Sequence, residues 1–248
     1  MHRTHLPLLT WAHAIYLIVS SSKGISAVTL SEMLGISYPS AWHLGHRVRA
    51  MMAEANPILS GEVEIGEMYA GAPPRKRVKS SRDHDDDDAP PANRKGRGIH
   101  VLVAAKRDDD EVAKVIPTHG KGAVAAVLVG VIDDTATVMT DGLPAYKHIG
   151  KTQSHLAVDH SARKYARTDE ATGHRGHVNR VESSNGFMRQ AVTGVLHSIS
   201  VKHLGRYTGE AKFSWNRRAG SCLDLMARMI RNGEGWLLSY SFLTGKAA

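Results

Sequence analysis

Two acidic residues in the second half of the chain have the types and positions that could hold a divalent metal. Asp141 follows the β-rich run Ala136–Thr140, at the carboxyl end of an expected strand, where α/β sheets gather functional groups. Glu182 lies near the start of a helical pattern that begins at Asn179. Carboxylates on a strand end and a facing helix can hold Mg²⁺, which takes one or two protein carboxylates plus phosphates and water. Two such ions would activate a water or a 3′-hydroxyl and stabilise the leaving oxygen in phosphodiester transfer.

Spacing alone leaves structural roles open for both acids. Asp141 precedes Gly142, and an aspartate before a glycine is commonly a turn residue. A glutamate in a first helical turn commonly complements the helix dipole. The 15 histidines are scattered without a metal-binding spacing, and the acidic run at 83–88 has the composition of a solvated tract. The single cysteine, Cys222, excludes a disulfide framework or a cysteine-based zinc site within this chain and fits a reducing cytoplasm.

The elements that must position these acids form an α/β pattern. Glu62–Tyr69 alternates, with Val63 and Ile65 on one face and Glu64 and Gly66 on the other. Three strands in a meander are followed by an apolar segment of helical length and a buried strand, which implies a crossover and a parallel neighbour. The pattern predicts strands at 62–69, 99–105, 112–116, 136–140 and 154–159, and helices at 122–132, 179–195, 204–215 and 223–231.

The first 58 residues predict a helix-turn-helix. Thr29 with Glu32 has the spacing of a capping box, Gly35 lies in a short turn, and Pro39 suits the first turn of the next helix. On that second helix the apolar stripe contains Leu44 and Val48. We expect the opposite face to enter a major groove, so that replacing its arginine would weaken DNA binding with little loss of stability; an ordinary helical hairpin is the alternative. This face carries Ser40, His43 and Arg47.

Charge favours a polyanionic partner. Of the 248 residues, 32 are lysine or arginine and 24 are acidic, which gives a net charge of +8. A hydrophobic content of 42% is enough for a packed core, so the charge belongs to a folded protein. We therefore expect salt-dependent contacts with the phosphates of double-stranded DNA. The cations expected to make them include Arg75, Lys76 and Arg77 in a long polar loop at 71–98, and Arg206, Lys212, Arg217 and Arg218 near the carboxyl end.

The apolar run Leu8–Val19 has to be distinguished from a targeting or membrane segment. It is shorter than the ~20 residues that span a bilayer. Its apolar positions have helical spacing, and His13 interrupts it. We expect a buried amphipathic helix, no membrane partner, and a cytoplasmic protein associated with the bacterial nucleoid. A signal peptide is the alternative.

Several motifs together resemble the transposase family of the IS1595 type, with its ISXO2-like catalytic domain. The resemblance implies an RNase H-like mixed sheet flanked by helices, with metal-dependent strand cleavage and transfer of the DDE type at the terminal inverted repeats of an insertion sequence. It also implies Mg²⁺ or Mn²⁺ as cofactor and several copies of the chain on DNA. The motifs are Gly61–Ala70, Val138–Tyr146, His177–Arg189, Lys202–Tyr207 and Phe213–Arg218, with Leu6-Pro7-Leu8, Trp11 and Ser21–Ser26 at the front.

The resemblance also assigns site residues and domains. The second family aspartate falls on Asp141 and the terminal acid on Glu182; these two are the expected metal ligands. Asn185 lies one turn later on the same helix face and is an alternative third residue. Arg189 is one turn further and could meet a phosphate. The expected division is a helix-turn-helix region at 1–58 and a catalytic domain at 59–248, without the Cys-rich ribbon that usually opens the family.

Gly66 is a departure from the family pattern. The family strand reads like V-E-[VI]-D-E, and this chain has Gly66 in place of the first aspartate. Glycine offers no ligand, Glu67 points to the opposite strand face, and Glu64 lies about 6–7 Å along the strand. We therefore expect a transposase whose cleavage is impaired and which Gly66→Asp restores. A non-catalytic DNA-binding protein derived from a transposase, and a nuclease or resolvase on the same fold, are the alternatives.

Overall fold

The computed structural model describes residues 4–70, 99–107, 111–116, 124, 128–141, 146, 149, 154–158, 166–168, 173, 175–196, 199–235 and 238–244. The polar loop expected at 71–98, with Arg75, Lys76 and Arg77, lies outside these residues, as do residues 122, 123 and 125–127 of the helix expected at 122–132. Strands expected from alternation and β-rich composition are present, and the order of the elements along the chain agrees with the sequence pattern.

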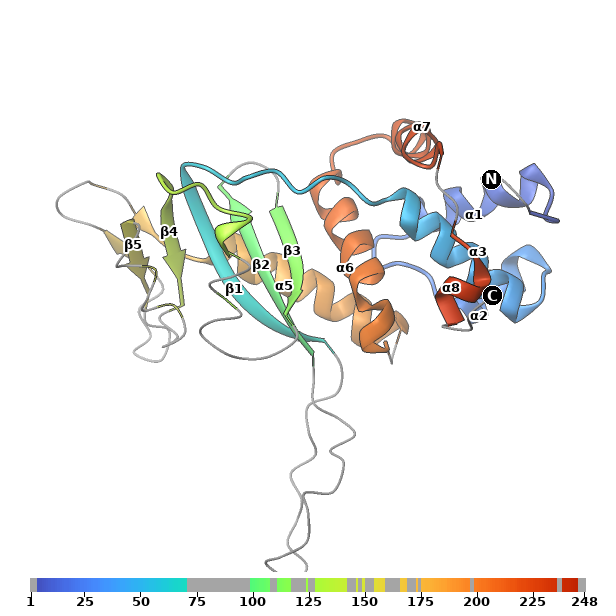
Figure 1. The fold of residues 1–248 in the computed structure, drawn as a ribbon, viewed down its shortest axis with the longest axis horizontal. Helices are drawn as coiled ribbons and strands as arrows, with labels where there is room; N and C mark the ends of the chain where they lie inside the picture. Colours follow the sequence, from blue (N-terminus) through green and yellow to red (C-terminus); the bar gives the residue numbers. More distant parts are fainter. Residues whose placement is uncertain are drawn as a thin grey trace, which may run out of the picture.

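A mixed five-stranded sheet with the order β3-β2-β1-β4-β5 forms the centre of the fold (Figure 1). β1 pairs antiparallel with β2, and β2 with β3, as the predicted meander requires. β4 pairs parallel with β1, and β5 pairs parallel with β4, which confirms the crossover. The strands are β1 (Glu62–Ala70), β2 (Ile99–Lys106), β3 (Glu111–Ile116), β4 (Thr137–Thr140) and β5 (Ser154–Ala157), and a separate two-stranded ribbon joins β6 (Arg167–Thr168) to β7 (Arg175–Gly176).

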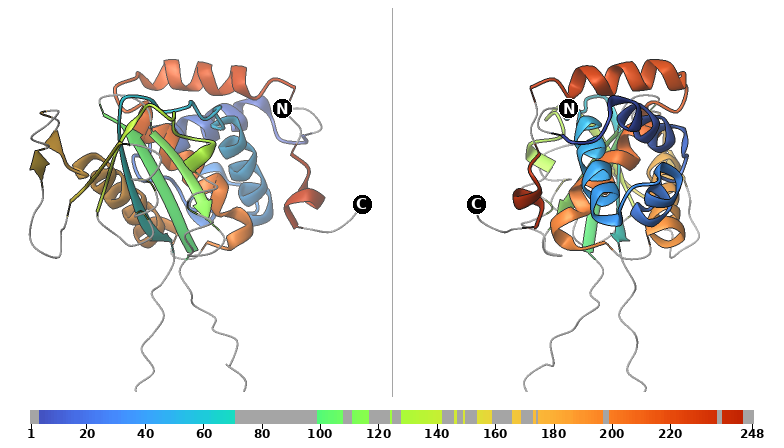
Figure 2. Two further views of the ribbon diagram at one scale, coloured as in Figure 1. Left: turned by 60° about the vertical axis from the view of Figure 1, so that its left-hand side comes forward. Right: turned by 90° about the vertical axis from the view of Figure 1, so that its right-hand side faces the viewer.

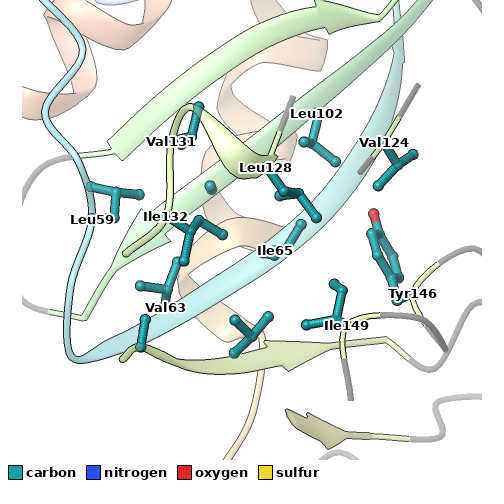
Figure 3. Packing of buried hydrophobic residues seen from close by; sticks show 13 residues of the cluster. Leu59, Val63, Ile65, Leu102, Val124, Leu128, Val131, Ile132, Tyr146 and Ile149 are labelled. Atoms are coloured by element: carbon teal, nitrogen blue, oxygen red, sulfur yellow. The ribbon is translucent and has the colours of Figure 1, made fainter. Parts of the chain in front are cut away.

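Alternation along β1 divides the sheet into two buried faces. Val63 and Ile65 point into a hydrophobic cluster with Leu102 and Ile132, and Tyr146 lies at its edge (Figure 3). Met68 points to the other face, where it packs with Val181 from helix α5 (Asn179–Ala191). α5 continues into the π-helix η2 (Val192–Leu196). The helix that carries Glu182 therefore covers the sheet face on which Glu64 and Gly66 lie.

The amino-terminal helices share their core with the last helices of the chain. The helices α1 (Leu8–Ser20), α2 (Ala27–Leu34) and α3 (Tyr38–Met51) form one group, and α6 (Val201–Asn216) lies between this group and the sheet (Figure 1). Helix α7 (Cys222–Asn232) lies across the group (Figure 2). One cluster joins Trp11, Ile15 and Leu44 to Phe213 of α6 and Met229 of α7. The apolar stripe predicted for α1 is thus buried by both ends of the sequence, and the cluster crosses the expected division at residue 58.

Helix α2 begins earlier than the sequence pattern suggests. Ser26 is its N-cap, and the Ser26 hydroxyl accepts a hydrogen bond from the Thr29 backbone N–H at 3.1 Å. The expected capping box at Thr29 is therefore wrong, since Thr29 already lies in the first turn. Gly35 ends the helix with a φ of 62°, a left-handed conformation that glycine adopts without strain. In the part of the chain that the structure describes, no helix is long and apolar enough to cross a membrane.

Candidate active site

Asp141, Glu182 and Asn185 line one cavity of about 270 Å³ beside the central strand β1, where β4 ends. Asp141 directly follows β4, while Glu182 and Asn185 lie on successive turns of α5. The cavity forms where β4 ends beside Ile65, halfway along the longer parallel strand β1, close to the start of the helix that covers β1. The cavity is also lined by Gly66, Val181 and Arg189. The structure therefore brings together the acids and the asparagine expected from the sequence, and their metal-binding role stays a prediction.

Gly66 faces this cavity and is closely covered by α5. A Cβ atom built on Gly66 would lie 2.5 Å from the Val181 Cγ1 atom and 3.4 Å from the Asn185 Nδ2 atom. Contacts below 3.0 Å require a shift of the neighbouring group. The space that an aspartate would need is thus filled by Val181. The single substitution Gly66→Asp is consequently a weaker test than the sequence suggests, because the new side chain must also displace the Val181 side chain.

The two nearby glutamates are held by other groups. The Glu64 side chain has no exposed surface and accepts hydrogen bonds from the backbone N–H groups of Arg180 and Val181. Glu67 points to the other face of β1, where it accepts a hydrogen bond from the Tyr146 hydroxyl at 3.1 Å and lies 3.5 Å from His100 Nδ1. Burial, together with the charge of Glu67, raises the pKa of Tyr146, so this hydroxyl remains a donor. Neither glutamate replaces the missing aspartate in this arrangement.

The donor set fits one divalent cation better than a pair. Asp141 and Glu182 supply two carboxylates to the cavity, and an ion between them would complete its shell with water and phosphate oxygens. Among the described residues no group of three or more histidine, cysteine, aspartate or glutamate side chains could hold a metal. A pair of ions normally needs further bridging carboxylates, and Gly66 provides none.

The expected recognition face of α3 is covered. His43 Nε2 lies 3.2 Å from the Leu238 carbonyl oxygen, and the ring of Tyr240 from α8 (Tyr240–Thr244) packs edge-on against His43. The Arg47 side chain is buried, its residue 8% exposed, and its guanidinium lies 4.6 Å from the centre of the Trp11 ring. The expectation that Arg47 lies on an open face is wrong. Periodicity located the apolar stripe correctly but gave no sign of the carboxyl-terminal segment; Ser40 is half-buried and bonds to Ser37.

The expected phosphate-binding cations have different environments. Lys212 is 5% exposed and donates to the Asn56 side chain at 2.9 Å, which contradicts its expected exposure. Arg217 pairs with Glu54 at 3.2 Å, and Arg206 donates to His203. Lys212 and Arg217 thus hold the segment between α3 and β1 against α6. Arg189 and Arg218 are exposed, and Arg189 also lines the acid cavity.

Sequence reasoning missed the partners of Glu64 and Glu67. From the sequence alone, Glu64 is only a poor substitute ligand, and Tyr146 is only the last residue of a family motif. Their contacts join residues 116 and 79 positions apart, so no local periodicity contains them. The available signal was weaker: a glutamate in the middle of an apolar strand needs a buried partner.

Comparison with known proteins identifies the family. The model of the ISXO2-like transposase domain matches residues 58–216, which is more than half of the chain. The chain belongs to this family. The matched region contains the sheet, α5 and the acid cavity. Among solved structures, one that is similar is a crystal structure of a pre-cleavage Mos1 transpososome, with 10% identity and a TM-score of 0.30 over 96% of this chain and 82% of that chain. No curated protein matches the sequence.

Proposed function

We propose that this member of the ISXO2-like transposase family binds the DNA ends of an insertion sequence but cleaves them poorly. Family membership supports DNA as the partner, and the net charge of +8 favours phosphate contacts. The observation that carries the proposal is the packing of Gly66 against Val181: Gly66 supplies no carboxylate beside Asp141 and Glu182, and the Val181 side chain fills the space that an aspartate at this position would need. Several copies acting together on DNA, in the cytoplasm, belong to the same proposal.

The roles of the cavity residues follow from their chemistry. Asp141 and Glu182 would hold one Mg²⁺ or Mn²⁺, which when bound supplies Lewis acidity to a phosphate oxygen. Asn185 offers an amide beside them, and it donates to the Glu67 carbonyl oxygen at 3.4 Å, so its orientation is fixed by β1. Arg189 lines the same cavity and would orient a DNA phosphate there. Binding and orientation are thus available to this chain.

Cleavage of a duplex that carries the inverted repeats flanking the coding sequence tests the proposal. We compare the unaltered chain, Gly66→Asp, Gly66→Asp with Val181→Ala, and Val181→Ala alone as the matched control. The unaltered chain and the control should bind the duplex without cutting it. The double variant should cut in Mg²⁺ or Mn²⁺ with little change in DNA affinity, because Val181→Ala gives the aspartate its space. Adding Asp141→Ala should abolish that gain.

Two outcomes of this experiment would contradict the proposal. Efficient metal-dependent cleavage by the unaltered chain would show that two carboxylates suffice. A folded, DNA-bound double variant that remains inert would favour the second candidate, a non-catalytic DNA-binding protein derived from a transposase, which the closed packing at Gly66 also supports. Cutting without joining of the ends to new DNA would indicate a nuclease or resolvase.

A further inference from the structure

Glu64 is a fully buried carboxylate on the central strand of the sheet. Its relative exposure is 0%, and it lies on the same face of β1 as Gly66, beneath α5. An ionised carboxylate is costly to bury unless hydrogen bonds and opposite charges compensate it. The groups that compensate Glu64 therefore indicate which part of the molecule depends on it.

One oxygen of Glu64 caps helix α5. Oε2 accepts hydrogen bonds from the backbone N–H of Arg180 at 2.8 Å and of Val181 at 3.3 Å. The first N–H groups of a helix have no partner inside the helix, and a negative charge there meets the positive end of the helix dipole. Val178, at the N-cap position, provides no side-chain hydrogen bond. β1 thus supplies the cap that the local sequence of α5 lacks.

The other oxygen of Glu64 lies between two basic side chains. Oε1 is 3.1 Å from His177 Nδ1 and 3.5 Å from Arg107 Nε. Arg107 also pairs with Glu62 and donates to the Arg175 carbonyl oxygen at 3.1 Å. Since Arg175 and His177 immediately precede α5, these contacts hold the chain that enters the helix as well as its first turn.

The capped turn adjoins the acid that lines the cavity. Glu182 directly follows the two anchored amides, and each residue of an α-helix advances about 1.5 Å and turns about 100°. The direction in which the Glu182 side chain points relative to Asp141 therefore depends on the position of the first turn of α5. Val181 against Gly66, and Asn185 against the Glu67 carbonyl oxygen, fix the rotation of the same helix.

We propose that Glu64 is a positioning residue: it fixes the start of α5 and thereby directs Glu182 toward Asp141. It does not replace the ligand missing at Gly66, because both of its oxygens face the start of α5 and the basic groups around it. The inference rests on the proposed function, which assigns cation binding to Asp141 and Glu182. It adds a residue on which that binding depends.

Binding of Mn²⁺ alone to the full chain is measured by electron paramagnetic resonance of the free ion. Two variants of Glu64 distinguish whether Mn²⁺ binding depends on the length of this side chain or on its negative charge. Glu64→Gln keeps an oxygen that can accept from the two amides but removes the charge. Glu64→Asp keeps the charge but is one methylene too short to reach them. Positioning predicts that Glu64→Gln retains most of the Mn²⁺ affinity and that Glu64→Asp loses about tenfold or more, as supporting residues around metal ligands typically do. Glu62→Gln, which alters the other carboxylate on Arg107, is the matched control and should not change the affinity.

The reverse ranking, with Glu64→Gln weaker than Glu64→Asp, would overturn the proposal, because it would show that the charge itself binds the ion. Equal Mn²⁺ affinity in both variants and the unaltered chain would overturn it too, since Glu64 would then only stabilise the fold. Asp141→Asn tests the proposed function separately: if this change leaves Mn²⁺ binding intact, the assignment of the cation site fails.

Backbone amide hydrogen exchange gives a second measurement that needs no metal. Glu64→Asp should accelerate exchange across residues 180–185 by about tenfold while leaving β2 unaffected, because local opening of the first turn exposes those amides. Glu64→Gln should keep their protection. Unchanged exchange at 180–185 in Glu64→Asp would show that Glu64 does not hold α5, and would overturn the proposal whatever the metal measurements give.

Discussion

His46 is enclosed by aromatic rings at the junction of α3 and α6. Its ring centre lies 4.5 Å from that of Trp42 and 4.7 Å from that of His203, and its relative exposure is 0%. Among the described residues neither ring nitrogen has a hydrogen-bond partner. Burial, reinforced by the nearby charge of Arg49, lowers the pKa of His46 from 6.5 to about 3. The folded protein therefore holds this histidine neutral, whereas the unfolded chain protonates it in mild acid.

The difference predicts acid sensitivity with a definite sign. The contribution of His46 to the free energy of unfolding is fully present above pH 6.5. It falls as the pH decreases toward about 3, because in this range only the unfolded state takes up the proton. Each pH unit in this window costs about 1.4 kcal/mol, so His46 accounts for about 2 kcal/mol between about pH 7 and about pH 5. Urea unfolding of the unaltered chain and of His46→Phe at both pH values measures this. An equal loss of stability in the two proteins would contradict the assignment to His46.

The sequence predicted the strands of the sheet better than it predicted which segments cover the faces of the strands and helices. Alternation predicted β1 and the orientation of Val63 and Gly66, and the strand–helix–strand order predicted a parallel neighbour for β4, although not that this neighbour would be β1. The acid cavity followed from the resemblance of short motifs around Asp141 and Glu182. Contacts between distant segments were not predictable, because periodicity shows which face of a helix is apolar but not what covers the polar face. The contact of the half-buried His43 with the Leu238 carbonyl oxygen, 195 residues away, is such a case.

The covered face of α3 changes the prediction for Arg47. Arg47→Ala removes a buried cation that packs over Trp11, so we now expect it to lower the free energy of unfolding by about 1–2 kcal/mol. Arg218 packs over Trp215 in a similar way but is exposed, and it serves as the matched control. Arg218→Ala should weaken DNA binding with little loss of stability. Thermal melts and DNA titrations of both variants give the ranking; a stable Arg47→Ala with weakened DNA binding would restore the recognition-helix interpretation.

At the scale of the whole molecule, the hydrophobic cluster that joins Trp11 to Phe213 and Met229 makes the two ends of the chain interdependent. Phe213 is 1% exposed and belongs to α6, which also packs against β3. Phe213→Ala should cost about 3–5 kcal/mol as a buried aromatic truncation. We expect the amino-terminal helices and the sheet to unfold in one transition, followed by circular dichroism and Trp fluorescence. Separate transitions for the two regions in the unaltered chain would show that they fold as independent domains.

The same cluster bears on how the protein is made. A ribosome releases α1, α2 and α3 first, and their apolar stripe has no partner until α6 and α7 have been synthesised, more than 150 residues later. During that interval the nascent helices expose Ile15, Leu44 and their neighbours, the kind of surface that chaperones bind and that otherwise aggregates. A reading frame interrupted before Phe213 would leave the stripe without its cover. Truncated products should therefore be degraded rather than persist as DNA-binding fragments that compete with the complete chain.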